Sequence, residues 1–159
     1  METLERFISE LDFFKGFPEK FINLIYGCAS NVVLKQGEYF CHEGENVTHF
    51  YAVRSGKVAI DIPYPGRGNI TIQTIGPGEV FGWGWLFHPY QSRFSARVQS
   101  DVRAFAFDGT CLRNKLEENH HLGYELIQRF AYVIIDRLEA SRRQLIDVCT
   151  QPENMIFAE

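Results

Sequence analysis

The sequence predicts a mainly antiparallel β-domain, a sandwich or barrel, with helices on both sides and a long helix toward the C-terminus. Three observations support this prediction. Short alternating apolar and polar segments over residues 31–108 are separated by glycine, proline and asparagine about every ten residues. On both sides of this region, apolar residues recur every three to four positions, which is the period of an amphipathic helix. The last helical segment, residues 120–148, contains no proline.

The N-terminal zone, residues 1–30, is expected to form short helices. Leu4 and Ile8 share one face of the first helix. Pro18 is expected to begin the second, because proline is favoured in the first turn of a helix, and Phe21 contributes to its apolar face.

The strand-rich zone, residues 31–108, contains the segment PYPGRG at 63–68, which is expected to be an exposed hairpin tip because it concentrates turn-forming residues. Helices are expected again over residues 109–150, followed by a tail at 151–159. With 159 residues, the chain is expected to form one domain overall.

The long C-terminal helix carries an apolar seam whose members alternate between spacings of four and three residues. This spacing is typical of a coiled coil, so we expect the helix to pair with its twin in a homodimer. A second stripe, at Leu126, Phe130 and Val133, is expected to pack on the chain's own barrel. The alternative is one broad stripe that is buried within a single domain. The predicted dimer contacts are Ile127, Ala131, Ile134, Leu138, Ser141 and Leu145.

Composition and charge argue against several partners. The net charge is −4 and the pI about 5.7, so no basic face for nucleic acid is indicated. The N-terminal segment METLERFISELDFFKGF is acidic and amphipathic, unlike a signal peptide. No apolar stretch approaches the roughly 20 residues of a membrane span. We therefore expect a cytoplasmic protein without membrane contact.

The four cysteines, Cys28, Cys41, Cys111 and Cys149, lie far apart in the sequence and form no Cys-x-x-Cys pair. They are expected to be buried, reduced thiols, as in most cytoplasmic proteins. Because zinc and iron–sulfur sites need clustered ligands, no cofactor is expected.

The order of elements resembles the cyclic nucleotide-binding domain, in particular the sensor half of Crp/Fnr-type regulators. Three segments carry the resemblance. GENVTHFYAVRSGKVAI (44–60) matches a glycine, a Tyr-containing strand and a glycine turn into the next strand. IGPGEVFGWGWLF (75–87) matches the strand, turn and short helix of the phosphate-binding cassette, and FSARV (94–98) matches the strand that closes it. The resemblance covers residues 10–148 and implies an antiparallel β-jelly roll, or double-stranded β-helix.

The resemblance also implies a ligand site in the cassette, residues 78–98. In the family, backbone N–H groups at the start of the short helix point at a cyclic phosphate. A glutamate in this helix accepts from the ribose hydroxyl, and an arginine before the closing strand pairs with the phosphate. The candidate ligand-binding residues are Gly82, Trp83, Gly84, Trp85, Arg93, Phe94, Ser95, Ala96, Arg97 and Ser141.

This chain departs from the family pattern at both diagnostic polar positions. Trp83 stands where the glutamate is expected, and Phe94 stands where the arginine is expected. A charge-assisted hydrogen bond contributes roughly 1.5–3 kcal/mol, so each replacement is expected to weaken cyclic nucleotide binding about tenfold to a hundredfold.

Alternatives remain open at the cassette. Arg93 or Arg97 could supply an anion ligand in place of the missing arginine, or both could be rim or solvated residues. The aromatic side chains could fill the vacated pocket, or they could line a site for a flatter, more apolar ligand. In the family, a hydroxyl residue at the position of Ser141 meets the ligand across the dimer; alternatively, Ser141 simply allows close helix packing.

A cupin-like metalloenzyme is the main catalytic alternative, since such barrels hold a metal through His-x-His, a glutamate and a later histidine. The sequence has no His-x-His, and His42 with His49, near Glu43 and Glu45, is only a weak substitute. Haem, which some relatives of the family use, has no specific ligand here. No Ser-His-Asp, G-x-S-x-G or P-loop signature is present, so we predict that the chain is not an enzyme.

Crp/Fnr regulators bind DNA through a helix-turn-helix domain after the long helix, but only nine residues follow Thr150 here. We expect a complete chain without direct DNA binding; a truncated chain would instead be the sensor half of a regulator. The sequence thus predicts a stand-alone regulatory or sensor domain. It would bind an atypical small ligand, such as an anion or nucleotide-like molecule, and signal through the C-terminal helix to a partner protein. The alternative is a non-binding domain that acts as a protein-interaction scaffold.

Overall fold

The computed structural model describes residues 4–151. The chain forms two compact units, Met1–Gly123 and Tyr124–Glu159. Of the expected tail at 151–159, residues 152–159 lie outside the described residues. Within the described part of the chain, no helix is both long enough and apolar enough to cross a membrane.

The first unit begins with three short helices: α1 (Leu4–Glu10), the 3-10 helix η1 (Asp12–Phe14) and α2 (Glu19–Tyr26). The expected second helix is confirmed, because α2 starts directly after Pro18. The apolar residues Ile8 and Phe21 are buried, as their periodicity indicated.

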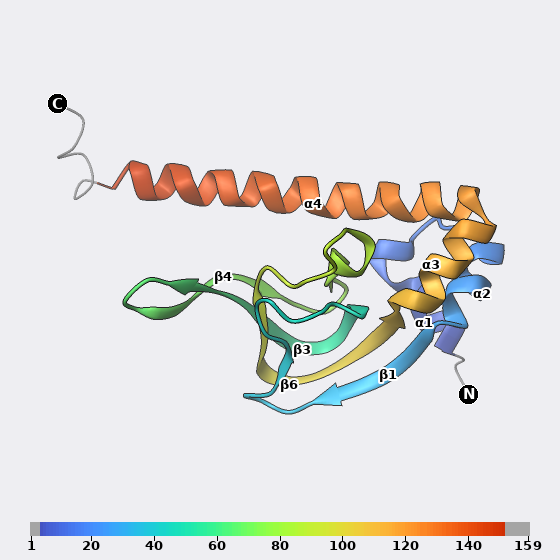
Figure 1. Cartoon of the computed structure of the whole chain (residues 1–159), viewed down its shortest axis with the longest axis horizontal. Coiled ribbons are helices and arrows are strands. Elements are labelled where there is room, and N and C mark those ends of the chain that lie inside the picture. Colours follow the sequence, from blue (N-terminus) through green and yellow to red (C-terminus); the bar gives the residue numbers. More distant parts are fainter. Residues whose placement is uncertain (1–3, 152–159) are drawn as a thin grey trace. The chain divides into compact units, whose positions relative to one another are not determined.

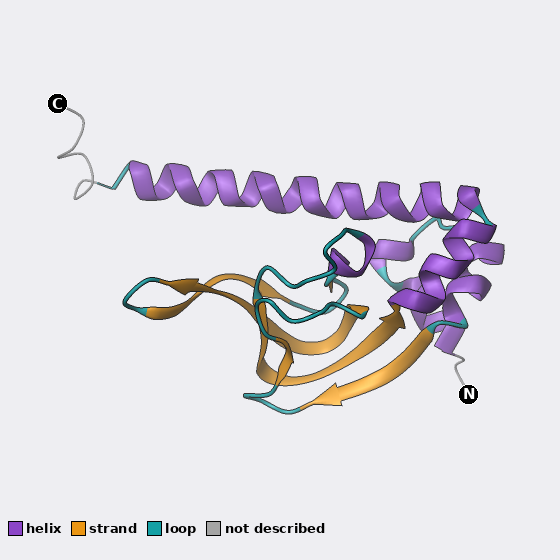
Figure 2. Cartoon of the chain, in the orientation of Figure 1, coloured by secondary structure: helices purple, strands orange, loops and turns teal. Residues whose placement is uncertain are grey.

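The fold is an antiparallel sheet with flanking helices and a long C-terminal helix, as the sequence predicted (Figures 1 and 2). Its main strands are ordered β1–β6–β3–β4, while β2 pairs with β6 and β5 pairs with β3. The strands are β1 (Ala29–Leu34), β2 (Tyr39–Cys41), β3 (His49–Tyr64), β4 (Gly68–Ile75), β5 (Val80–Phe81) and β6 (Ser95–Asp108).

The long strands β3 and β6 pair from His49 with Asp108 to Asp61 with Ser95. They carry much of the buried apolar core, in which the rings of Phe50 and Phe107 stack at 4.3 Å. The expected hairpin tip at 63–68 is confirmed as the turn that joins β3 to β4.

Gly56 is not the turn between strands that the family resemblance implies. Strand β3 runs through Gly56, and its register with β6 shifts on both sides of this residue, so that the glycine lies in a β-bulge. Its φ is +85°, and a Cβ added here would lie 2.1 Å from the carbonyl oxygen of Asp101. Glycine is therefore required because the facing backbone leaves no room for a side chain.

The N-terminal helices contact the sheet through aromatic side chains. The guanidinium of Arg54 lies 4.7 Å from the ring centre of Phe7 in α1 and 4.8 Å from that of Phe105 in β6. Such cation–π contacts are favourable when the charge is partly shielded from water. Phe14 in η1 adds a tilted contact with Phe107, at 5.6 Å.

Helix α3 (Gly109–Glu118) follows β6 directly, and α4 (His120–Cys149) follows α3. The Asp108 carboxylate caps α3 by accepting a 2.7 Å hydrogen bond from the Cys111 amide. The predicted long helix over residues 120–148 is confirmed.

The expectation of four reduced thiols is wrong, because Cys28 and Cys111 form a disulfide with a Cα–Cα distance of 5.7 Å. The two residues are 83 positions apart in the sequence, but the antiparallel pairing of β1 with β6 brings them together. The Asp108 amide donates to the Cys28 carbonyl at 2.9 Å, only three residues before Cys111. Among the described residues, Cys41 and Cys149 are the free cysteines.

We predict that Gly56→Ala lowers the free energy of unfolding by more than about 2 kcal/mol, because a positive φ and a backbone clash add together. Gly66→Ala is the matched control, since Gly66 also has a positive φ, +77°, but faces open space. We expect this control to lose about 1 kcal/mol. Urea unfolding of both variants measures the difference, and equal losses would contradict the bulge interpretation.

Candidate functional site

The candidate site is the segment 78–98, which contains β5, the 3-10 helix η2 (Trp83–Leu86) and the start of β6. The short cassette helix is thus present. Gly82 has a φ of +90°, and a Cβ there would lie 3.1 Å from the His49 carbonyl oxygen. A Cβ on Gly84 would lie 2.9 Å from a methyl group of Val47. These glycines allow the cassette to approach the chain's own loop and strand closely.

The two tryptophans of η2 lie in different environments. Trp85 is fully buried, and its indole stacks on Phe50 at 6.0 Å. Its carbonyl oxygen accepts a hydrogen bond from the Arg113 guanidinium of α3. Trp83, at the expected glutamate position, is half-buried. The Trp85 side chain is therefore a core residue, and the ligand role of both residues stays a prediction.

Phe94 lies one residue before the closing strand β6, at the expected arginine position. Its half-buried ring packs against the apolar core that includes Ile60 and Ala96. Its carbonyl oxygen accepts from the Ser92 hydroxyl at 2.5 Å and from the Cys41 thiol at 3.8 Å. An apolar, uncharged group thus stands where the family resemblance places a cation.

The polar groups beside Phe94 form hydrogen bonds within the chain itself. The Ser95 hydroxyl is buried and accepts from the Glu43 amide at 3.1 Å. The backbone of Ala96 pairs with Cys41 of β2 and with Ile60 of β3. Burial raises the pKa of the Cys41 thiol, and the hydrogen bond between Cys41 and Ser92 opposes part of this shift.

Arg97 of β6 forms an ion pair with Asp61 of β3. Its Nε donates to the Asp61 carboxylate at 2.8 Å, and this bond raises the pKa of Arg97. Asp61 is only 3% exposed and also accepts from the Thr71 hydroxyl at 2.6 Å. A buried carboxylate requires such partners. Arg93 is exposed and forms no ion pair within residues 4–151.

The cassette borders a set of partly buried apolar residues, of which the sequence singled out only Phe94 as a site residue. The rings of Phe40 and Tyr51 lie 4.6 Å apart, and Phe40 also contacts Phe81 of β5 at 5.2 Å. Burial raises the pKa of Tyr51. Cys41 and Ser92, 51 positions apart, meet through the pairing of β2 with β6, which residue patterns alone did not reveal. The partly buried residues on this core are Val32, Leu34, Phe40, Cys41, Tyr51 and Phe94.

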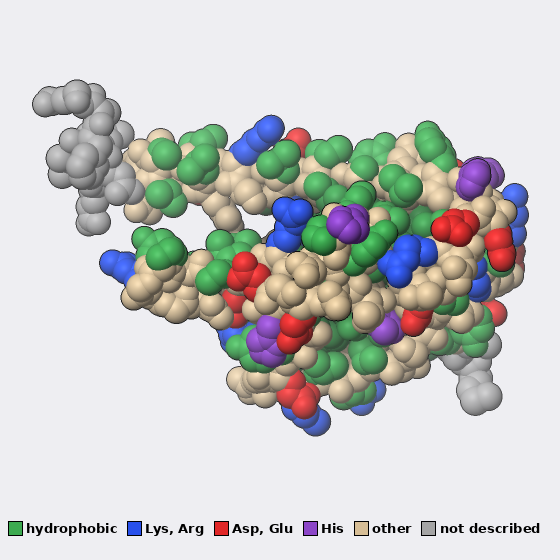
Figure 3. Space-filling model, in the orientation of Figure 1, with side chains coloured by type: hydrophobic (Ala, Val, Ile, Leu, Met, Phe, Trp, Pro, Cys, Tyr) green, Lys and Arg blue, Asp and Glu red, His purple; other side chains and the backbone are tan. Residues whose placement is uncertain are grey.

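The predicted seam of α4 is largely exposed in the single chain. Leu138 is 49% exposed and Leu145 is 63% exposed, whereas Leu126 and Phe130 of the second stripe are buried. Figure 3 shows apolar side chains along this helix. The Ser141 hydroxyl donates to the carbonyl oxygen one turn earlier, at 2.9 Å. The other seam residues are Ile127, Ala131 and Ser141, which are exposed, and Ile134, which is half-buried.

Across the described residues, no group of three or more His, Cys, Asp or Glu side chains is arranged to hold a metal ion. His42 and His49 each have one acidic neighbour. His42 lies 3.2 Å from Glu45, and His49 lies 3.7 Å from Asp108.

Comparison with known proteins identifies relatives over most of the chain. The model of the cyclic nucleotide-binding domain matches residues 31–119. The CRP-like cAMP-activated global transcriptional regulator of Mycobacterium tuberculosis is 26% identical over 146 residues, which cover 91% of this chain and 63% of the regulator. The chain therefore spans less than two thirds of the length of this relative.

Solved structures share the fold. A putative cyclic nucleotide-binding protein from Geobacter metallireducens superposes with a TM-score of 0.77 at 23% identity, over 86% of this chain and 99% of that protein. The catabolite activator protein of Thermus thermophilus gives a TM-score of 0.69 at 21% identity, over 86% of this chain and 62% of that protein. The chain therefore shares the fold of these proteins over most of its length.

We predict that Arg97→Met lowers the free energy of unfolding by about 1–3 kcal/mol, because it leaves the buried Asp61 carboxylate without its cationic partner. The same change at Arg93, which is exposed and outside any ion pair of the described chain, is expected to cost less than about 0.5 kcal/mol. Urea unfolding at neutral pH measures both. If Arg97→Met leaves the free energy of unfolding unchanged, the structural role of this arginine is contradicted.

Proposed function

Because the chain belongs to the cyclic nucleotide-binding domain family, we propose that it is a non-catalytic regulatory domain of the cytoplasm whose cassette takes an atypical small ligand. The ligand we propose is flat and carries little negative charge, such as a nucleoside-like molecule. The M. tuberculosis relative is named as a cAMP-activated regulator, so a ligand-operated role is the natural starting point.

The observation that carries this proposal is the replacement of the phosphate-pairing arginine by Phe94. Phe94 packs against the core, while the nearest arginine on β6, Arg97, is held by Asp61. A phosphate buried in this cassette would lack the charged hydrogen bonds that offset its desolvation. A ligand that stacks on the half-buried aromatic residues Phe40, Tyr51 and Phe94 fits this environment better.

Helix α3 offers a route by which such a ligand would act. Arg113 of α3 donates to the Trp85 carbonyl, and its guanidinium lies 4.9 Å from the ring centre of Tyr90. A Cβ on Gly109 would lie 2.8 Å from the Trp85 side chain, so α3 and η2 are in direct contact. A ligand that shifts η2 would therefore shift α3, and α4 follows α3 after Asn119.

A homodimer through the seam of α4 is part of the same proposal. The exposed positions of the seam keep the heptad-like spacing of a coiled coil, which supports pairing with a second copy. The output would be read by a partner protein, or by a DNA-binding segment if the natural protein extends beyond this chain.

A protein-interaction scaffold is the second candidate function. It is favoured because the chain itself uses the polar groups of the cassette: the Ser95 hydroxyl accepts from the Glu43 amide, and the Ala96 backbone pairs with Cys41 of β2 and Ile60 of β3. In that case, no small ligand binds, and the aromatic side chains only fill the former pocket.

We predict that cAMP leaves the melting temperature of the wild-type protein almost unchanged, whereas adenosine-like ligands raise it. Restoring the two family contacts with Trp83→Glu and Phe94→Arg should allow cAMP to stabilise the folded state. At 100 times Kd, a ligand adds about 2.7 kcal/mol, or a shift of roughly 5–10 °C for a domain of this size. Thermal unfolding with cAMP, cGMP and adenosine measures this.

Phe94→Leu is the matched control, since it makes the same position smaller without adding a charge. Circular dichroism first establishes that each variant folds. A strong cAMP shift in the wild-type protein, with no gain in the double variant, would contradict the proposed loss of the phosphate site. No shift with any ligand of the panel would favour the scaffold.

We predict that Leu138→Glu makes the protein monomeric, because a charge would be buried in the apolar seam. Tyr132→Glu is the control: Tyr132 is 62% exposed on α4 but lies outside the seam, so this variant should remain dimeric. Sedimentation velocity distinguishes the two outcomes. A wild-type protein that is monomeric at high concentration would contradict the dimer.

A further inference from the structure

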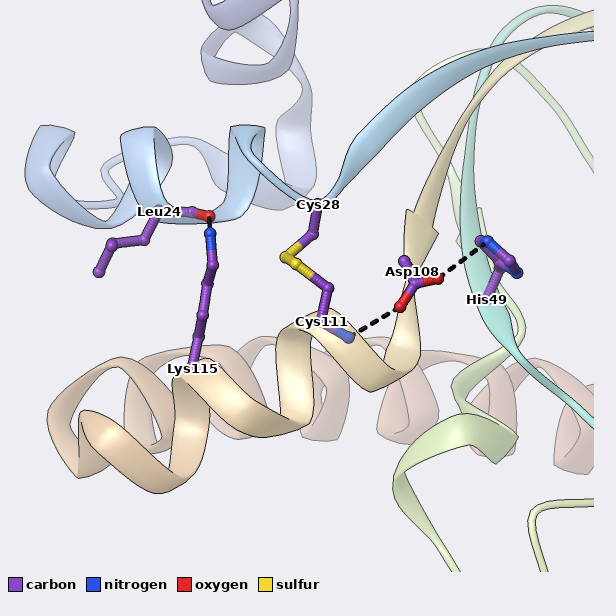
Figure 4. Close-up of a disulfide and its surroundings, with 6 residues drawn as sticks. All are labelled: Leu24, Cys28, His49, Asp108, Cys111 and Lys115. Atoms are coloured by element: carbon purple, nitrogen blue, oxygen red, sulfur yellow. Dashed lines mark hydrogen bonds and ion pairs between the residues drawn. A yellow bond between two sulfur atoms is a disulfide. The ribbon is translucent and has the colours of Figure 1, made fainter.

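Helix α3 is attached covalently to the corner between α2 and β1. Cys28 lies at this corner, one residue before β1, and Cys111 lies in the first turn of α3 (Figure 4). The Cys28 backbone is itself fixed, because its amide donates to Ile25 and its carbonyl accepts from Asp108. The disulfide therefore ties α3 to the hydrogen-bonded corner from which β1 starts.

Two sets of side-chain contacts also hold α3, in addition to the hydrogen bond from the Gly109 amide to the Thr48 carbonyl. Lys115, one turn after Cys111, donates from its ammonium to the Leu24 carbonyl near the end of α2 (Figure 4). Arg113 and Gly109 contact the cassette helix η2 instead. The helix is thus held from the α2–β1 corner on one side and from the cassette on the other. Only the corner side includes a bond that a redox reaction can break.

The disulfide is also placed where exchange is chemically accessible. Cys111 is half-buried, whereas Cys28 is only 6% exposed, so an attacking thiol reaches the Cys111 sulfur more easily. Attack on the Cys111 sulfur releases the Cys28 thiolate, and the Lys115 ammonium, which lies beside Gly27 next to Cys28, is a nearby positive charge that stabilises a thiolate. The Asp108 carboxylate, which faces His49 at 3.7 Å, opposes this effect.

We propose that the Cys28–Cys111 pair is a thiol–disulfide exchange site that controls how firmly α3 is held. One molecule of a glutathione-type thiol attacks a sulfur as the thiolate, breaks the disulfide and forms a mixed disulfide. A second molecule then attacks the glutathione sulfur of this mixed disulfide and displaces the remaining protein cysteine as its thiolate. Two cysteine thiols and one glutathione disulfide result, and the two electrons come from the two glutathione thiols.

Reduction leaves the contacts of α3 with the cassette in place but removes its covalent attachment to the α2–β1 corner. The oxidised state therefore holds α3 to the sheet, and the reduced state allows α3 to follow η2. In a reducing compartment, a persistent disulfide is unusual and is most often transient or redox-sensing. The consequence for signalling rests on the proposed function, whereas the exchange chemistry and its effect on α3 do not.

The test uses the full chain with Cys41→Ser and Cys149→Ser, so that only Cys28 and Cys111 react. The protein is equilibrated with mixtures of reduced and oxidised glutathione, the free thiols are trapped with a maleimide, and mass spectrometry counts them. We expect both thiols to disappear together as the oxidised fraction rises. Hydrogen exchange without ligand should then show residues 109–118 exchanging at least about tenfold faster in the reduced protein, with β3 and β6 unchanged.

Cys28→Ser combined with Cys111→Ser provides an independent measurement, since it should reproduce the reduced exchange pattern in every glutathione mixture. Two results would overturn the proposal. In one, both thiols remain free even in excess oxidised glutathione; in the other, α3 exchanges equally fast in both redox states. Because no ligand is present, either failure is separate from failure of the proposed ligand binding.

Discussion

The antiparallel pairing of β3 with β6 is the constraint on which the rest of the structure depends. At one end of the pair, Asp61 lies opposite Ser95, which places the closing strand of the cassette beside a buried carboxylate. At the other end, His49 lies opposite Asp108, which caps α3. The pairing of these two strands therefore fixes both the candidate ligand site and the start of α3. The bulge at Gly56 allows the strands to stay paired over this length.

Much of the fold could be predicted from the sequence because the signals are local. The periodicity of α4 and the turn residues at 63–68 each depend only on neighbouring residues, and both predictions are confirmed. Gly56 was recognised as a special position but assigned to a turn. A positive φ serves a turn and a bulge equally well, and only the approach of Asp101 from the partner strand distinguishes them.

The features that were not predicted all depend on pairs of residues that are distant in the sequence. The disulfide requires β1 to lie against β6, and the Arg97–Asp61 ion pair requires β6 to lie against β3. From residue types alone, Arg97 could be either a residue that binds an anion or a solvated residue at the rim. By contrast, the replacements at Trp83 and Phe94 were visible at once, because the family pattern assigns a polar group to each position. Whether the altered cassette takes a ligand stays a prediction.

Phe94, which stands where the family has an arginine, predicts that this cassette does not bind a phosphate. Phosphorus-31 NMR of cAMP tests it directly, because the nucleus reports on the contact that Phe94 replaces. If the cassette does not hold the phosphate, the cAMP resonance should keep its position and width when an equimolar amount of the protein is added. A shifted or strongly broadened resonance, which returns to its free position when excess cGMP is added, would contradict it.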